Sequence, residues 1–105
     1  MLLLDFSSAR ELEELIFNRY FPLDIRIQQR RGRKSITIVQ GLASDLSLKR
    51  ILKAWKNSFK CNGAIVEDEE EGKIIQLQGD QRQNVHDFLI NEEINHEDDI
   101  IVHGV

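Results

Sequence analysis

The chain has 105 residues, 41% of them hydrophobic, which is enough for one folded domain with a single core and too little for two. Its one cysteine excludes an internal disulfide, and no apolar run approaches the length that crosses a membrane. The run Leu2–Leu4 is too short for a secretory signal and has no basic flank, so we expect a soluble protein of the cytoplasm.

The formal net charge of −4 argues against a nucleic-acid ligand, but the two signs of charge are segregated along the chain. Residues 25–60 hold ten basic residues and one acidic residue, a net charge of +9. The rest of the chain holds 4 basic and 17 acidic residues, a net charge of −13. A single-sign field of this size costs self-repulsion and therefore indicates a partner of opposite sign.

Residues 1–22 are expected to form an N-terminal arm, and residues 23–105 are expected to form the folded domain. In the arm, Ser7 or Ser8 is suited to cap a short helix, which Pro22 would prevent from continuing. A disordered arm is the alternative.

Residues 23–40 are expected to form a β-hairpin. Ile25 and Ile27 alternate with other residues on the first strand, and Ile36 and Ile38 do so on the second. A glycine, Gly32, supplies the positive φ that a tight turn needs. The turn contains four cations, which are well placed to contact the phosphates of a nucleic acid. The alternative is a solvent-exposed turn whose charges only aid solubility. These cations are Arg30, Arg31, Arg33 and Lys34.

A helix is expected next, capped by Ser44 or Asp45 and ending near Phe59. Apolar residues at helical spacing predict one buried stripe, and Trp55 belongs to it, so we expect this side chain in the core. A band of lysines without an acidic residue flanks the stripe. It consists of Lys49, Lys53, Lys56 and Lys60. Because a solvated helix face normally mixes charges, the band favours an anionic partner.

Residues 64–66 and 73–78 are expected to pair as a second hairpin with an acidic turn. The turn comprises Glu67, Asp68, Glu69, Glu70, Glu71 and Gly72. These carboxylates lack the spacing of a calcium loop, and no metal or cofactor is expected. The acidic run is either a solvated turn or an element that repels phosphate.

A strand-to-helix corner follows the second hairpin. Gly79 breaks the strand, and Asp80 with Gln83 resembles a capping box for a helix over about residues 81–93. Arg82 lies in the first helical turn, where the helix dipole disfavours a cation. Its guanidinium either reaches back to Asp80 or points at an external anion.

The last apolar run, residues 100–102, predicts a fifth strand. The order is then ββαββαβ, an α+β fold built as a two-layer α/β sandwich, with a mostly antiparallel sheet of about five strands and two helices on one face. The histidines are scattered, and Cys61, expected as a small buried thiol, has no metal-ligating neighbour, so no enzyme is predicted. A general RNA-binding sheet is the weaker alternative, because the expected strands lack aromatic residues for stacking on bases.

Several segments of the chain resemble the eukaryotic translation initiation factor one family, over about residues 25–105. They are Ile25–Arg30, Gly32–Lys34, Val39–Gly41, Leu48–Lys53, Cys61–Gly63, Ile74–Arg82 and Val102–Gly104. The most specific part is the run Gln78-Gly79-Asp80-Gln81-Arg82. Two features depart from the family: Arg31 stands where Asn is common, and the second hairpin is more acidic than usual.

The resemblance implies a factor that binds the small ribosomal subunit near the P site. Such a factor holds the subunit open for scanning and opposes accommodation of initiator tRNA until the start codon pairs. The implied partners are small-subunit rRNA, initiator tRNA and initiation factors two, three and five, and the free chain is expected to be a monomer. A related role in reinitiation or recycling is the alternative.

The resemblance also implies roles for particular residues. It places the basic turn, the lysine band and Arg82 against rRNA, and the acidic turn of residues 67–72 towards initiator tRNA. Start-codon fidelity is expected to be sensitive to changes at four residues: Gly79, Asp80, Gln81 and Gly104.

Overall fold

The computed structural model describes residues 22–42, 46–70 and 72–104. The expected arm lies outside the described residues except for Pro22, and so does Glu71 of the acidic turn. The elements are β1 (Leu23–Gln29), β2 (Ser35–Gln40), α2 (Leu48–Phe59), β3 (Gly63–Asp68), β4 (Gly72–Gln78), α3 (Arg82–Asn91), the short 3-10 helix η1 (Glu97–Asp99) and β5 (Ile100–Val102). The expected ββαββαβ order is therefore confirmed, with η1 added before the last strand.

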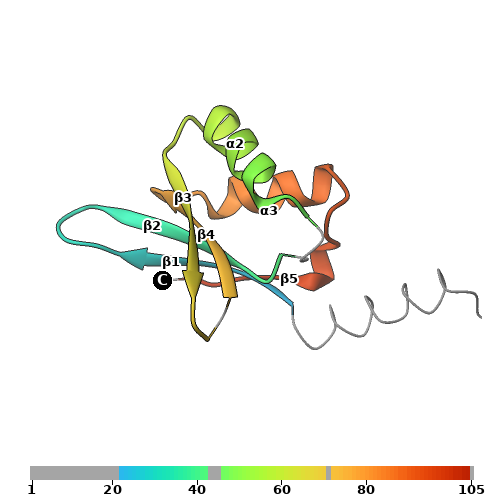
Figure 1. The fold of residues 1–105 in the computed structure, drawn as a ribbon, viewed down its shortest axis with the longest axis horizontal. Helices are drawn as coiled ribbons and strands as arrows, with labels where there is room; N and C mark the ends of the chain where they lie inside the picture. Colours follow the sequence, from blue (N-terminus) through green and yellow to red (C-terminus); the bar gives the residue numbers. More distant parts are fainter. Residues whose placement is uncertain (1–21, 43–45, 71, 105) are drawn as a thin grey trace, which may run out of the picture.

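The strands form one five-stranded sheet in the order β3-β4-β2-β1-β5. The pairs β1–β2, β2–β4 and β3–β4 are antiparallel, whereas β5 joins β1 in parallel at the edge. The predicted mostly antiparallel sheet is thus confirmed. Figure 1 shows the β1–β2 turn projecting at the left of the view and the β3–β4 turn at the bottom.

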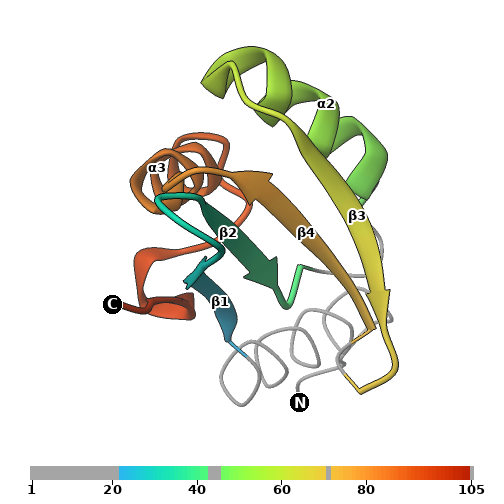
Figure 2. The same ribbon diagram turned by 90° about the vertical axis from the view of Figure 1, so that its left-hand side faces the viewer.

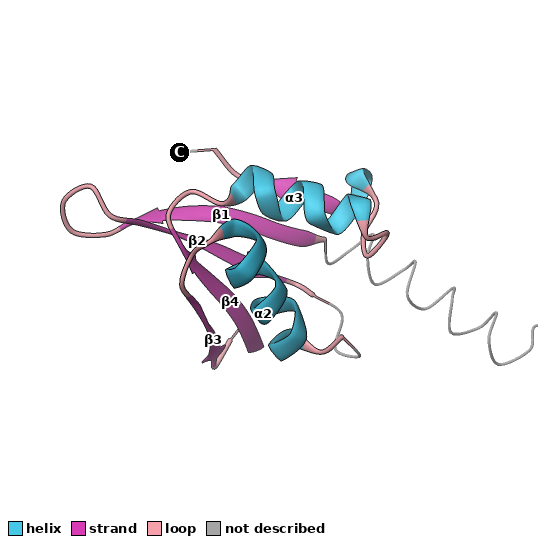
Figure 3. Ribbon diagram, turned by 90° about the horizontal axis from the view of Figure 1, so that it is seen from above, coloured by secondary structure: helices cyan, strands magenta, loops and turns pink. Residues whose placement is uncertain are grey.

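Both helices cover the same face of the sheet, as Figures 2 and 3 show from two directions. Helix α2 packs mainly on β3 and β4, whereas α3 packs on β1 and β5. Trp55 of α2 is fully buried, and its ring stacks on Phe59 and meets Phe88 of α3 edge-on at a centroid distance of 5.9 Å. The expected place of Trp55 in the core is confirmed, and this aromatic contact joins the two helices.

The central strand β2 is buried on both faces. Val39 lies opposite Ile25 of β1 in the register and belongs to the helix-covered core. By alternation Thr37 shares that face. Ile36 and Ile38, which the sequence suggests as the apolar side of this strand, lie on the opposite face, where Ile38 is also buried. The helix-facing side therefore includes a buried threonine in a position that hydropathy alone assigns to solvent.

The start of α2 differs from the sequence prediction, whereas its end agrees with it. The predicted caps Ser44 and Asp45 lie outside the described residues, and the helix begins only at Leu48, so that prediction is wrong. Ser47 occupies the N-cap position with an extended backbone but forms no side-chain cap bond. The predicted end at Phe59 is confirmed, and Lys60 then adopts a left-handed φ of 50° that stops the helix. None of the helices in the described ranges is long and apolar enough to cross a membrane.

Candidate nucleic-acid interface

The β1–β2 turn presents its cations to solvent. The backbone N–H of Arg30 donates to the carbonyl oxygen of Lys34 at 2.7 Å, which closes the turn. Gly32 has a φ of +70°, as predicted from the sequence, and an added Cβ there would meet nothing within 4 Å. The four cations of the turn, Arg30, Arg31, Arg33 and Lys34, are all exposed. We call this group the basic turn.

The lysine band of α2 lies outside the apolar stripe, as the helical spacing predicts. Ile51 and Trp55 are buried against the sheet, whereas all four lysines are exposed. Within the residues that the structure describes, none of these ammonium groups pairs with a carboxylate. The charges are therefore not neutralised inside the described fold, which leaves them available to an anionic partner.

Hydrogen bonds between strands bring the basic turn and the C-terminal end of α2 to the same end of the sheet. The N–H of Gly79 donates to the carbonyl of Ser35, the first residue after the basic turn, at 2.8 Å. The N–H of Gln78 donates to the carbonyl of Asn62, two residues beyond Lys60, at 2.9 Å. The corner at Gln78 and Gly79 is thus flanked on both sides by segments that carry cations, so these distant parts of the sequence form one basic end.

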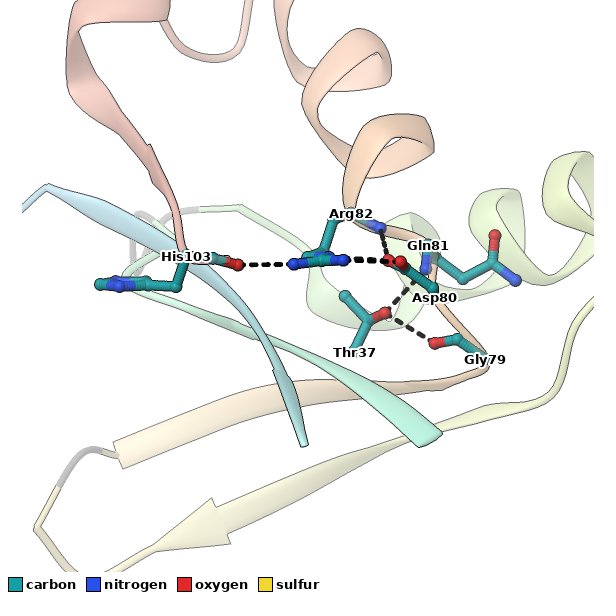
Figure 4. Close-up of polar contacts among 6 residues, drawn as sticks. All are labelled: Thr37, Gly79, Asp80, Gln81, Arg82 and His103. Carbon is teal, nitrogen blue, oxygen red and sulfur yellow. Dashed lines mark hydrogen bonds and ion pairs between the residues drawn. The ribbon is translucent and has the colours of Figure 1, made fainter. Parts of the chain in front are cut away.

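A buried hydroxyl holds this corner in place (Figure 4). Thr37 Oγ1 donates to the carbonyl oxygen of Gly79 at 2.7 Å and accepts the backbone N–H of Gln81 at 2.8 Å. The Thr37 residue is fully buried, and Gly79 has a φ of +84° that favours glycine. Sequence reasoning missed Thr37; the available signal was a polar residue in the middle of an otherwise apolar strand.

The predicted capping box of Asp80 and Gln83 is wrong, although Asp80 does accept from a backbone N–H at the start of the helix, as predicted. The helix begins at Arg82 with Gln81 as N-cap, and no side chain caps it. The backbone N–H of Gln81 is bonded to Thr37 instead of lying inside the helix. Gln83 donates to Asp87 and makes no bond back to Asp80. Instead Asp80 Oδ1 accepts from the backbone N–H of Arg82 at 3.3 Å, as in an Asx-type turn.

The guanidinium of Arg82 is bonded inside the protein. Its Nε and Nη2 donate to the two carboxylate oxygens of Asp80 at 2.8 and 2.7 Å, and its Nη1 donates to the carbonyl of His103 at 2.8 Å. The local pairing that the sequence left open is therefore present. The hydrogen bonds from Arg82 hold the pKa of the Asp80 carboxyl below its usual range.

The same arginine connects the corner to the C-terminal strand. His103 donates its backbone N–H to Ile25 at 2.8 Å, and its Nε2 lies 2.9 Å from Asp24 Oδ1. Arg82 bonds the carbonyl of His103 (Figure 4), and Gly104 is the next residue in the chain. Of the residues expected to affect fidelity, Asp80 is thus linked through Arg82 to the carbonyl of His103, the neighbour of Gly104, whereas Gly79 and Gln81 are linked to each other through Thr37. The sequence did not predict either link.

The acidic turn lies at the other end of β4. Glu67, Asp68, Glu69 and Glu70 are exposed, and Asp68 Oδ1 accepts the backbone N–H of Glu70 at 2.8 Å. Asp68 pairs with Gly72 at the start of β4, whereas the basic end begins at Gln78, six residues further along the same strand. At about 3.3 Å per residue, the strand separates the two ends by roughly 20 Å.

The remaining chemistry-bearing residues do not form a site in the described parts of the chain. No three His, Cys, Asp or Glu side chains gather there as metal ligands. Cys61 is half-buried against the core, and burial raises the pKa of its thiol although Lys56 acts in the opposite direction. A neutral thiol is a poor nucleophile, which agrees with the structural role expected for Cys61.

The fold and its charges define a class: a small α+β domain with a cationic end. The sequence matches the family described as "Translation initiation factor SUI1" over residues 21–95. It is 51% identical over 82 residues to eukaryotic translation initiation factor 1 of Mus musculus, covering 78% of this chain and 73% of that protein. It is 55% identical over 80 residues to the protein translation factor SUI1 homolog of Brassica oleracea, covering 76% and 71%. The chain therefore belongs to the SUI1 family of translation initiation factors, which is not a family of enzymes.

A solved structure shows the same fold at lower identity. The C-terminal domain of human eIF2D aligns with a TM-score of 0.64 and 23% sequence identity. The alignment covers 75% of this chain and 41% of that one. At this identity the likeness supports the fold alone.

Proposed function

We propose that this translation initiation factor binds the small ribosomal subunit near the P site. There it favours the open scanning state and opposes initiator tRNA until the start codon pairs. The observation that carries the proposal is the basic end, where the basic turn and the C-terminal end of the lysine band meet across Gln78 and Gly79. Exposed, unneutralised cations at one end of a rigid sheet suit the phosphates of rRNA. Cytoplasmic localisation, a monomeric free state and contacts with factors two, three and five follow from the family resemblance.

The corner contributes by positioning. Gly79 lies at the basic end, and Arg82 joins the next residue, Asp80, to the carbonyl of His103 beside Gly104. The resemblance places Arg82 against rRNA, but its Nε, Nη1 and Nη2 are used inside the protein. We therefore assign Arg82 the role of orienting the corner and the C-terminal strand relative to each other, so that substitutions at either place disturb the same surface.

The acidic turn is assigned to the side that faces initiator tRNA. Its carboxylates lie roughly 20 Å from the basic end, measured along β4. A subunit bound at the basic end would leave the acidic turn free to repel a second polyanion. Each exposed charge contributes about 1 kcal/mol or less, and several together are needed to shift a poised equilibrium.

Co-sedimentation with isolated small and large ribosomal subunits tests the proposal. Lys53→Glu should weaken binding to small subunits, and the double change Lys53→Glu with Lys56→Glu should weaken it further. Lys73→Glu is the matched control, because it makes the same charge change on an exposed residue of β4 near the acidic turn. The logarithm of the association constant should fall linearly with the logarithm of the salt concentration, with a slope of roughly −0.7 to −0.9 for each phosphate contacted. Equal losses for Lys53→Glu and Lys73→Glu, or an affinity independent of salt, would refute the role of the basic end.

A further inference from the structure

A hollow opens at the basic end, between the basic turn and the corner after β4. Its volume is about 500 Å³. The lining residues from the turn are Arg30, Arg33, Lys34 and Ser35, and those from the strands and corner are Ile36, Gln78 and Gly79. Volumes of a few hundred Å³ are typical of pockets that enclose a small organic group, so the hollow is large enough for one nucleotide.

The two walls of the hollow differ in chemistry. On one side stand three exposed cations, for which no carboxylate partner lies within the described residues. On the other side, Ile36 of β2 lies directly opposite Gln78 of β4 in the strand register. Residues paired in this way project from the same face, so an apolar side chain and an amide lie next to each other. The charged side chains of the lining therefore come from the basic turn, whereas the strands contribute the apolar side chain of Ile36 and the amide of Gln78.

Phosphate contact alone does not require the second wall. The backbone of an RNA duplex can be bound by cations on an open surface, without a hollow, an apolar side chain or an amide. An unpaired nucleotide does present all three chemistries, because its base has an apolar face and a polar edge and its phosphate is anionic. The Gln78 side chain has both a donor and an acceptor for such an edge, and it forms no hydrogen bond with another residue in the described parts of the chain.

We propose that this hollow is a subsite for a single unpaired RNA nucleotide. The base lies against Ile36 with its edge at the Gln78 amide, and its phosphate lies at Arg30, Arg33 and Lys34. The inference rests on the proposed function, since it names the kind of RNA feature that the basic end takes. Such a subsite would allow the sheet to recognise an unstacked base although its strands carry no aromatic residue.

Fluorescence anisotropy with three RNA hairpins tests the subsite in the full chain. One hairpin carries a single bulged uridine, the second an abasic residue at the same position, and the third no bulge. We expect the bulged uridine to bind about fivefold more tightly than the abasic bulge, which is roughly the net value of one hydrogen bond from the base edge to Gln78. Gln78→Ala and Ile36→Ser should remove this preference while leaving affinity for the abasic hairpin nearly unchanged. Gln76→Ala is the control, since it lies on the same face of β4 but pairs with Ile38, away from the hollow.

Equal affinity for the uridine and abasic hairpins would overturn the inference, and so would an unchanged preference in Gln78→Ala. Gln78 is exposed, so its change does not put the fold at risk even if Ile36→Ser unfolds the sheet. Binding to small subunits is measured in parallel. If the wild-type chain binds small subunits but shows no preference for the uridine bulge, the subsite alone is rejected. If the wild-type chain binds small and large subunits equally well, the proposed function is rejected.

Discussion

The hydroxyl of Thr37 offers the sharpest test of how this fold holds its functional corner. Thr37→Val keeps the shape of the side chain and replaces only the hydroxyl by a methyl group. The change leaves the carbonyl of Gly79 without its donor and the N–H of Gln81 without its acceptor. Thr37→Ser is the matched control, because it keeps both hydrogen bonds and loses one methyl group.

The expected cost follows from the two lost bonds. An unpaired buried backbone group costs about 1–3 kcal/mol, and both groups here are only partly buried, so the lower half of that range applies to each. We therefore expect Thr37→Val to lower the free energy of unfolding by about 2–4 kcal/mol. Thr37→Ser should cost about 1 kcal/mol, the value of one buried methyl group. For a domain of this length each kcal/mol corresponds to a shift of roughly 4–8 °C in Tm.

Urea denaturation of the three chains, with thermal unfolding as a second measure, provides the comparison. The m values should stay equal, so that the difference lies in stability alone. The corner should also move, and Thr37→Val should reduce affinity for small subunits where Thr37→Ser does not. A valine variant as stable as the serine variant would refute the reasoning, because it would show that the corner does not depend on the hydroxyl.

Two further predictions concern carboxylates. The pKa of Asp80 is depressed in the folded chain, so its pairing with Arg82 stabilises the fold above the unfolded pKa of about 3.9. This stability is lost as the pH falls through the lower folded pKa. Between about pH 5 and pH 2 the wild type should therefore lose more stability than Asp80→Asn, and parallel acid unfolding curves would contradict this. Neutralising the acidic turn with Asp68→Asn, Glu69→Gln, Glu70→Gln and Glu71→Gln should leave subunit binding equal or slightly tighter but increase initiation at near-cognate codons in a reconstituted scanning assay. Unchanged codon stringency would leave the turn with a solubilising role only.

The local features of the fold could be predicted because they depend on neighbours in sequence. The alternation of apolar residues located the hairpins, helical spacing located the core stripe, and glycine placed the basic turn. The capping prediction at Asp80 failed for the opposite reason. The helix begins two residues after Asp80, and the backbone N–H of the residue between them, Gln81, is held by Thr37, 44 residues earlier in the chain. No local pattern around Asp80 contains that information.

The charges of the candidate interface could also be predicted, but their arrangement could not. The sequence identified the basic turn and the lysine band as separate groups. Their meeting at one end of the sheet depends on β4 lying between β2 and β3, which places Gln78 and Gly79 beside Asn62 and Ser35. The hollow arises from the same pairing. Strand order is a property of the whole chain, so local patterns of apolar and charged residues do not predict it.

The position of β4 also explains how one small chain can carry large charges of both signs without their cancelling. Its seven residues separate the basic end from the acidic turn by roughly 20 Å. At physiological ionic strength the screening length is about 8 Å, so each end acts almost independently on what lies next to it. The net charge of −4 is therefore a poor guide to binding. If the same residues were interspersed, neighbouring charges would neutralise one another within that length. Because they are held at opposite ends of one strand, the proposed function can assign binding of one polyanion to the basic end and repulsion of a second to the acidic turn.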